Sequence, residues 1–283
     1  MFFSPPTRHR SEEQSLTMIF TTKQTKVISV LKKTAKTIFA AAFWILVWEA
    51  ASRLVSQDNE LLLLILPSPA AVFKKWLEIG FTLDFLSAVG HTLLRIVTGF
   101  FVGVVSGFLL GILTHCFKLV NTLFSPLLKT IRAIPVVAII ILLYLFFKSG
   151  TLPVVIVALM VLPIIWQTVN DGLEGTDPKL LEAAKVFKLG NFKTLVSIKL
   201  PSITEAFTTA SVNALGLAWK SGVAAEVICL PEISLGTLLW MGKGNVNYDE
   251  VYAVTLTVVI LSLIIELALK HVCRAALKGG VKK

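Results

Sequence analysis

The chain has 283 residues, of which 55% are hydrophobic and only 16% charged, and its formal net charge is +10. Soluble chains contain roughly 45–50% apolar and about 25% charged residues, so this composition excludes a disordered chain and argues against an ordinary water-soluble domain. If the basic residues gather on one side of a membrane, the positive charge indicates orientation rather than a nucleic-acid partner. The three cysteines are widely spaced and match no metal or disulfide pattern.

Six stretches are apolar and long enough for a membrane-spanning helix, which needs about 20 residues. In chain order they cover roughly 37–55, 88–113, 127–147, 152–169, 203–227 and 251–272. We therefore expect an all-α integral membrane domain over 37–272. A cytoplasmic N-terminal segment, 1–36, precedes this domain, with disorder and a start at Met18 as open alternatives. A basic cytoplasmic tail, 273–283, follows it.

The basic residues fall mostly on one side of these spans when the N-terminus is placed in the cytoplasm. Twenty of the 27 then lie in cytoplasmic segments and five lie outside, while Arg53 and Arg95 lie within spans near the outer face. Cytoplasmic loops of membrane proteins carry the excess of Lys and Arg. The sequence therefore predicts a multi-pass protein of the cell (inner) membrane with both termini in the cytoplasm.

The second span carries four glycines at a spacing of four, which places them on one ridge of a helix. They are Gly99, Gly103, Gly107 and Gly111. A ridge without side chains allows a neighbouring helix to approach closely. We expect tight helix packing there, with helix sliding during transport as the alternative.

Two prolines, Pro126 and Pro135, enclose a stretch with Lys129 and Arg132 on one face at the start of the third span. Proline removes a backbone donor and kinks helices. We expect this stretch to lie at the cytoplasmic membrane interface before the third helix enters the bilayer.

The fifth span is polar for a membrane helix and ends in ionisable residues. A lipid-facing helix has no reason to carry such side chains, so they either line an aqueous path or form hydrogen bonds between helices. Ionisable residues within a membrane are costly and are usually functional or paired. The candidate pathway residues are Thr208, Ser211, Asn213, Trp219, Lys220 and Glu226, together with Arg95 of the second span.

The longest internal cytoplasmic segment, 171–202, contains an amphipathic helix from about Lys179, a break near Gly190 and a second short helix ending at Leu200-Pro201. A short helix across a membrane face is suited to docking on another protein. The sequence Glu182-Ala183-Ala184, followed by Ile198-x-Leu200-Pro201, resembles the EAA loop of ABC importer permeases. Lys188 stands where that family usually has glycine, two residues before Gly190.

Three further motifs resemble the nitrate/sulfonate/taurine subgroup of these permeases. Thr92-Leu93-x-Arg95 followed by Gly99-Phe100 is similar to its T-L-x-R-x-x-x-G-F element. Arg132-x-Ile134-Pro135 resembles its R-x-I-P element. Trp219 and Ala224-Ala225-Glu226 resemble its W-x(4)-A-A-E element. Together with the EAA loop, the resemblance covers about 37–272.

The resemblance implies the type I ABC importer fold and its mechanism. Two permease chains, expected here as a homodimer, form the pathway. A cytoplasmic ATPase dimer that binds ATP and Mg receives the EAA helix, and an extracytoplasmic binding protein delivers the substrate. By this resemblance, Glu182 contacts the ATPase, Ala183 and Ala184 allow close seating, and Lys188 or Gly190 sets the bend.

No G-x-x-x-x-G-K-[ST] phosphate loop, catalytic constellation or metal-ligand spacing occurs in the sequence, so the chain itself is not expected to be an enzyme. The implied substrate is a small anion such as nitrate, an alkanesulfonate, taurine or bicarbonate, with a thiamine-type pyrimidine precursor as the alternative. Lys220 would attract an anion or pair with an acidic neighbour. A stand-alone secondary transporter or channel is the alternative of another class, but it leaves the EAA loop without a role.

Overall fold

The structure, a computed structural model, describes residues 35–55 and 65–280, and every regular element in those ranges is helical. The chain divides into two compact units after Ala70. Most of the predicted N-terminal segment 1–36 lies outside the described residues, and so does the alternative start at Met18.

The first unit contains one apolar helix, Ala35–Val55, which is long enough to cross a membrane. Near its end Arg53 forms an ion pair with Glu49, one helical turn earlier, with 2.7 Å between Nε and Oε1. The Ser52 hydroxyl donates to the Leu66 carbonyl at 2.8 Å. This helix corresponds to the first predicted span.

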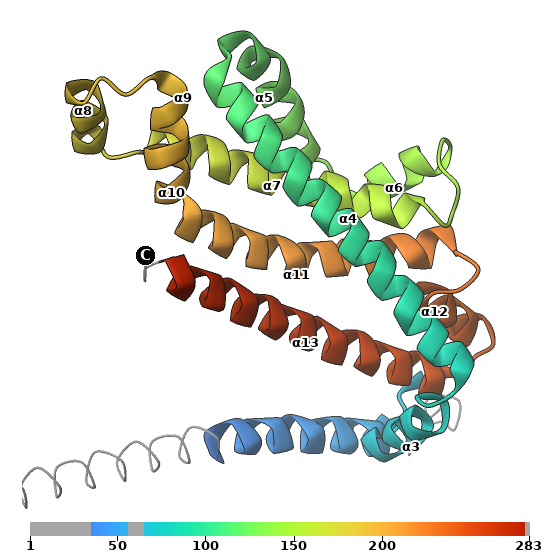
Figure 1. Ribbon diagram of the computed structural model, residues 1–283. Coiled ribbons are helices and arrows are strands. Elements are labelled where there is room, and N and C mark those ends of the chain that lie inside the picture. The colour runs from blue at the N-terminus through green and yellow to red at the C-terminus, as the bar shows by residue number, and fades with distance from the viewer. Residues whose placement is uncertain (1–34, 56–64, 281–283) are drawn as a thin grey trace, which may run out of the picture. The chain divides into compact units, whose positions relative to one another are not determined.

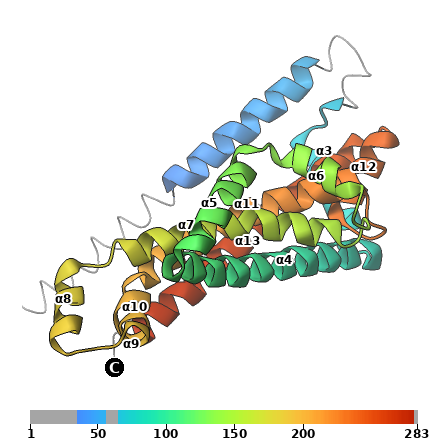
Figure 2. The ribbon, with the colours of Figure 1, turned by 90° about the horizontal axis from the view of Figure 1, so that it is seen from above.

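The second unit is a helical bundle (Figure 1). Its elements are α3 (Pro69–Ile79), α4 (Leu83–Cys116), α5 (Lys118–Ala133), α6 (Val136–Tyr144), α7 (Leu152–Glu174), α8 (Pro178–Val186), α9 (Asn191–Thr194), the π-helical turn η1 (Leu195–Lys199), α10 (Leu200–Ser202), α11 (Thr204–Cys229), α12 (Leu235–Gly244) and α13 (Tyr248–Gly280). The loop from α8 to α10 and the end of α13 lie at one end of the bundle, and α12 with the start of α4 lies at the other (Figures 1 and 2).

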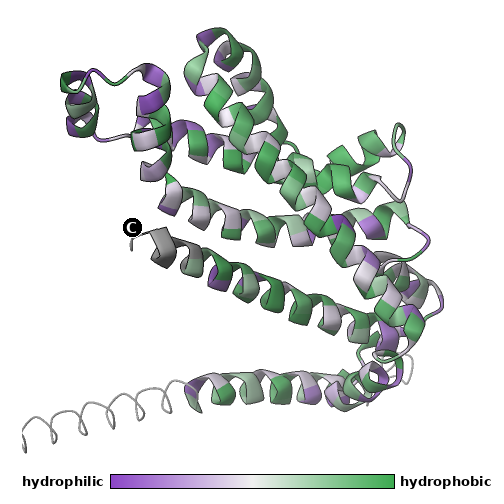
Figure 3. Cartoon of the chain, viewed as in Figure 1, coloured by the Kyte–Doolittle hydropathy of each residue, from purple (hydrophilic) through white to green (hydrophobic). Residues whose placement is uncertain are grey.

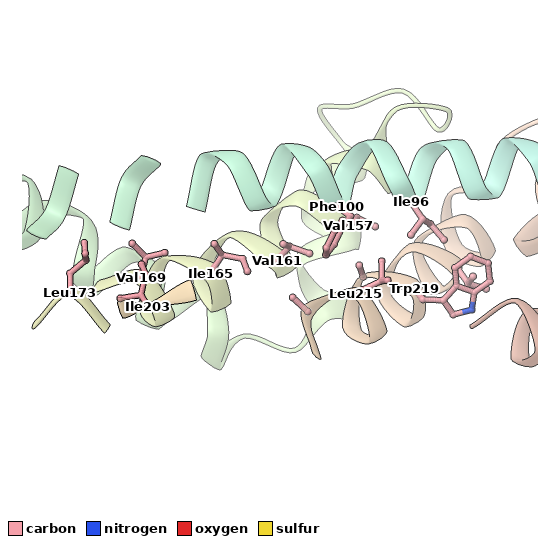
Figure 4. Packing of buried hydrophobic residues seen from close by; sticks show 13 residues of the cluster. Ile96, Phe100, Val157, Val161, Ile165, Val169, Leu173, Ile203, Leu215 and Trp219 are labelled. Carbon is pink, nitrogen blue, oxygen red and sulfur yellow. The ribbon is translucent and has the colours of Figure 1, made fainter. Parts of the chain in front are cut away.

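Helices α4, α7 and α11 enclose the main apolar core, which runs along their length (Figure 4). Ile96 and Phe100 of α4 pack with Val157 of α7 and Trp219 of α11, and each is at most 5% exposed. Residues of α13 pack against the same core. The surfaces of α6 and α13 that face away from it are apolar, as expected for contact with lipid (Figure 3).

The four glycines of α4 all lie against α7. A Cβ atom built at Gly99, Gly103, Gly107 or Gly111 would come within 2.6–2.7 Å of a carbonyl oxygen or a valine Cβ of α7. Real side chains do not tolerate such distances, so the approach of the two helices depends on the missing side chains. The ridge predicted from the spacing of these glycines is therefore the contact surface between α4 and α7.

Four helices among the described residues are long and apolar enough to cross a membrane: Ala35–Val55, α4, α7 and Tyr248–Cys273 within α13. The fifth predicted span corresponds to α11, which is 26 residues long but too polar to be among these four. Helix α13 extends into the predicted tail, as far as Gly280.

The third predicted span, 127–147, is bent: the chain turns by 106° between α5 and α6, at the proline where a kink is expected. Pro135 has no N–H to donate and restricts the preceding residue to extended conformations, and Ile134 has φ −78° and ψ 133°. Helix α6 has nine residues, or about 14 Å of helix, so it cannot cross a bilayer alone. Helix α5 carries Lys129 and Arg132 and forms a separate helix before this bend, so an interfacial position for it remains a prediction.

Candidate functional site

The loop between α7 and α11 begins with a turn that starts α8. Asp177 is the N-cap of α8, and its carboxylate accepts from the Lys179 N–H at 2.9 Å. Pro178 occupies the first helical turn, where its missing N–H leaves no hydrogen bond unmade. The Asp-Pro pair therefore fixes where α8 begins.

Helix α8 stands away from the bundle formed by α4, α7, α11 and α13 (Figures 1 and 2), and hydrophilic residues gather in this loop (Figure 3). Glu182 and Ala183 are exposed, whereas Ala184 is only 3% exposed. Ala183 is therefore accessible to another protein, whereas Ala184 is covered by its own chain.

Lys188 forms the bend after α8. Its φ is +53°, in the left-handed region that glycine favours. Its N–H donates to the Lys185 carbonyl at 3.0 Å, and the Leu189 N–H donates to the Ala184 carbonyl at 2.9 Å. This is the Schellman pattern that terminates helices. This chain thus ends α8 in a left-handed turn with a lysine at the turning position.

Gly190 has ordinary backbone angles and open space around it, so nothing at this position requires glycine. Of the two residues expected to set the bend, the structure selects Lys188. At the end of the loop, Leu200 packs against the main core and Pro201 is exposed. The loop is thus attached to the bundle at its second end through Leu200.

Most polar side chains of α11 are directed inward or towards their own backbone. The Thr208 hydroxyl donates to the Thr204 carbonyl at 2.7 Å, and that of Ser211 to the Phe207 carbonyl at 2.8 Å. Trp219 is buried, and its Nε1 donates to a carbonyl of α13 at 3.0 Å. Ser211 and Trp219 are thus buried between helices, whereas Thr208 is half-buried and lines a cavity with Thr209 and Asn213.

One face of α11 remains polar and exposed. Thr209, Asn213 and Lys220 are exposed there, with the half-buried Gly216 between them, and spacings of three and four place them on one ridge. Lys220, the single lysine of α11, has no carboxylate oxygen within 4.0 Å among the described residues. This face can contact water, a solute or a second chain.

Arg95 and Glu226 lie together in a buried cluster. Arg95 Nη1 lies 3.0 Å from Glu226 Oε1, and the Glu226 side chain is fully buried. Thr92 Oγ1 donates to the other carboxylate oxygen at 2.8 Å, and the Gly236 N–H approaches it at 3.4 Å. Arg95 Nη1 also donates to the Ile233 carbonyl at 2.8 Å. One carboxylate thus joins α4, α11 and the start of α12.

Thr92 was not among the candidate residues, although it belongs to the T-L-x-R motif. It donates to Glu226 and accepts from the Leu235 N–H at 3.0 Å. Its spacing of three from Arg95 was the available signal, since it places both residues on one face of α4. The cluster as a whole is an anchor between helices, because its polar groups are turned towards one another.

These features define the class. A bundle of apolar helices, one of them with a polar face, carries an exposed polar loop with a short helix at its end. This is the transmembrane domain of a type I ABC importer. The chain belongs to the family described as binding-protein-dependent transport system inner membrane component, which matches residues 99–277. It is accordingly a multi-pass permease subunit of the cell membrane.

Individual relatives agree with this assignment. A probable ABC transporter permease protein of Haemophilus influenzae is 26% identical over 81% of this chain and 91% of its own length. A taurine transport system permease protein of Escherichia coli is 24% identical over 75% and 78%. In fold, the chain is similar to a solved chain of the inward-facing MetNI methionine ABC transporter, with a TM-score of 0.60 at 19% identity, over 70% of this chain and 98% of that one.

Proposed function

We propose that the chain forms the substrate pathway of an importer whose energy comes from a separate ATPase dimer, with α8 as the coupling element. The observation that carries this proposal is the placement of Glu182: it is exposed on a short helix that stands away from the bundle. A second copy of the chain would complete the pathway, and an extracytoplasmic binding protein would deliver the solute. ATP and Mg would be bound by the ATPase alone.

The coupling role of Glu182 can be tested in the assembled importer. A hydrogen bond to a charged group contributes about 1.5–3 kcal/mol, so Glu182→Ala should weaken ATPase association by about tenfold or more. We expect less ATPase to co-purify and solute uptake into proteoliposomes to fall.

Glu205→Ala is the matched control, because Glu205 is also an exposed acidic residue but lies just outside the loop. It should leave both measurements unchanged. Normal co-purification and normal uptake with Glu182→Ala would contradict the proposed coupling role.

For the solute, we propose a small anion of the sulfonate or nitrate type. Two observations support it: Lys220 is exposed without a carboxylate within 4.0 Å among the described residues, and one relative is named for taurine, a sulfonate. An uncompensated ammonium group on the polar face of α11 favours an anion over a neutral pyrimidine.

Replacing Lys220 by methionine tests this substrate class. Methionine keeps the length of the side chain and removes the charge, so we expect taurine or nitrate uptake to fall by about tenfold while the complex still assembles. Lys148→Met is the control, since Lys148 is exposed in a loop outside α11. Unimpaired anion uptake by Lys220→Met would exclude a role of this charge in the pathway.

A further inference from the structure

A cavity of about 420 Å³ lies where the end of α4 meets α9 and η1, at the base of the coupling loop. None of the roles described above uses it. Its lining residues are His115, Cys116, Asn191, Phe192, Thr194, Leu195 and Lys199. The cavity therefore combines one ammonium group, one imidazole and one amide with the apolar surface of two side chains.

Among the described residues, no carboxylate forms an ion pair with the positively charged side chain of this cavity. Lys199 Nζ lies 2.8 Å from His115 Nε2, and among the described residues neither group has a carboxylate oxygen within 4.0 Å. Glu174 acts on His115 only at longer range, and its carboxylate accepts from Asn170 Nδ2 at 3.1 Å. An ammonium has three protons to donate, and the imidazole accepts only one of them.

The backbone holds Lys199 in this position. Lys199 ends η1, and the Leu200 N–H donates to the Leu195 carbonyl, which is the i→i+5 bond of a π-helical turn. Such turns are rare and frequently occur at functional sites. Lys199 is half-buried, so its charge is less screened by water than that of the exposed lysines in the same loop.

We propose that this cavity binds an oxyanion, with Lys199 as the charged ligand and His115 and Asn191 as hydrogen-bonding partners. A sulfate, sulfonate or phosphate group supplies the negative charge and the several acceptor oxygens that these donors require. The anion could come free from the cytoplasm or as the phosphate of a lipid whose headgroup carries a net negative charge. Bound there, it would join the end of α4 to the coupling loop, independently of how α8 contacts an ATPase.

Cys116 provides a local readout, because it lines the cavity and is exposed. The full chain, in nanodiscs of phosphatidylcholine or of phosphatidylglycerol, is treated with N-ethylmaleimide, and the labelling of each cysteine is followed by peptide mass spectrometry. Sodium sulfate is the free probe, with sodium chloride at equal ionic strength as the reference. Cys273 is the internal control, since it lies in a different cavity.

If a free anion binds, sulfate slows the labelling of Cys116 in phosphatidylcholine, by about tenfold at ten times its Kd, and leaves Cys273 unchanged. If a headgroup binds, labelling is slower in phosphatidylglycerol without sulfate, and sulfate adds little. In either case Lys199→Met should abolish the protection, whereas Lys199→Arg and Lys193→Met should retain it. Labelling of Cys116 that responds to neither sulfate nor lipid would overturn the proposal, as would full protection in Lys199→Met.

Discussion

Lys188 occupies a backbone conformation that costs an ordinary L-residue about 1–2 kcal/mol, and glycine avoids that cost. The motif located the position, but the sequence alone left open whether Lys188 or Gly190 makes the turn. Only the backbone angles distinguish them, with φ +53° at Lys188 and −65° at Gly190.

Lys188→Gly should therefore stabilise the chain by about 0.5–1 kcal/mol, since the relief of strain exceeds the added freedom of the unfolded chain. The measurement is the midpoint of thermal unfolding of the purified protein in detergent. Lys185→Gly is a control that should have the opposite effect on the midpoint. Lys185 lies within α8, where glycine lowers the stability of the helix by about 1 kcal/mol. A lower midpoint for Lys188→Gly would show that the lysine side chain stabilises the turn.

Arg95 and Glu226 were identifiable from the sequence as ionisable residues within the predicted spans. Their pairing with each other was not predictable. Arg95 and Glu226 are 131 residues apart in the chain, and only the packing of α4 on α11 brings them together. The contact between Lys199 and His115, which are 84 residues apart, was likewise not predictable, because only tertiary packing brings the two residues together.

The close packing of α4 on α7 depends on the glycine ridge of α4. Gly103→Leu would force a side chain into Val161 of α7, where even a Cβ atom has only 2.7 Å. Overpacking of this kind costs about 1–3 kcal/mol, so we expect a lower unfolding midpoint and less folded protein in the membrane.

Gly90→Leu provides the comparison within the same helix, because no atom lies within 4 Å of a Cβ at Gly90. That variant should unfold at or above the temperature of the unchanged chain, since leucine favours helix over glycine. Equal destabilisation by both substitutions would mean that the ridge is not what limits the α4–α7 contact.

Hydropathy predicted the apolar stretches of the chain but not the size of the bend within the third one. Ile134 and Pro135 are apolar, so the stretch 127–147 is continuous in composition although its backbone bends by 106°. Helix α11 shows the opposite case. Its hydroxyl groups at Thr208 and Ser211 lower its hydropathy, yet they are satisfied by the helix's own carbonyls, which composition does not reveal.

The distribution of the basic residues behind the net charge of +10 predicts an orientation in the membrane, and this orientation can be measured. In intact cells, a membrane-impermeant maleimide should label a cysteine introduced as Lys148→Cys, in the loop between α6 and α7. It should label one introduced as Lys193→Cys, in α9, only after the cells are permeabilised. Both lysines are exposed, so a difference reports the side of the membrane.

The native Cys116, at the predicted cytoplasmic end of α4, should behave like Lys193→Cys, which makes it an internal reference. Labelling of Lys193→Cys in intact cells together with protection of Lys148→Cys would reverse the orientation. The docking side proposed for the ATPase would then be wrong as well.

The ion pair between Arg95 and Glu226 can form only after the ribosome has synthesised both residues. At about 5–20 residues per second, the 131 residues between them take roughly 7–26 s to make. For most of that interval α4 has been synthesised while Glu226, the carboxylate that pairs with Arg95, has not. An isolated arginine is costly within a bilayer, and its long side chain lowers this cost by reaching the headgroups. The predicted position of Arg95 near the outer surface therefore allows α4 to remain in the membrane until α11 is synthesised and inserted.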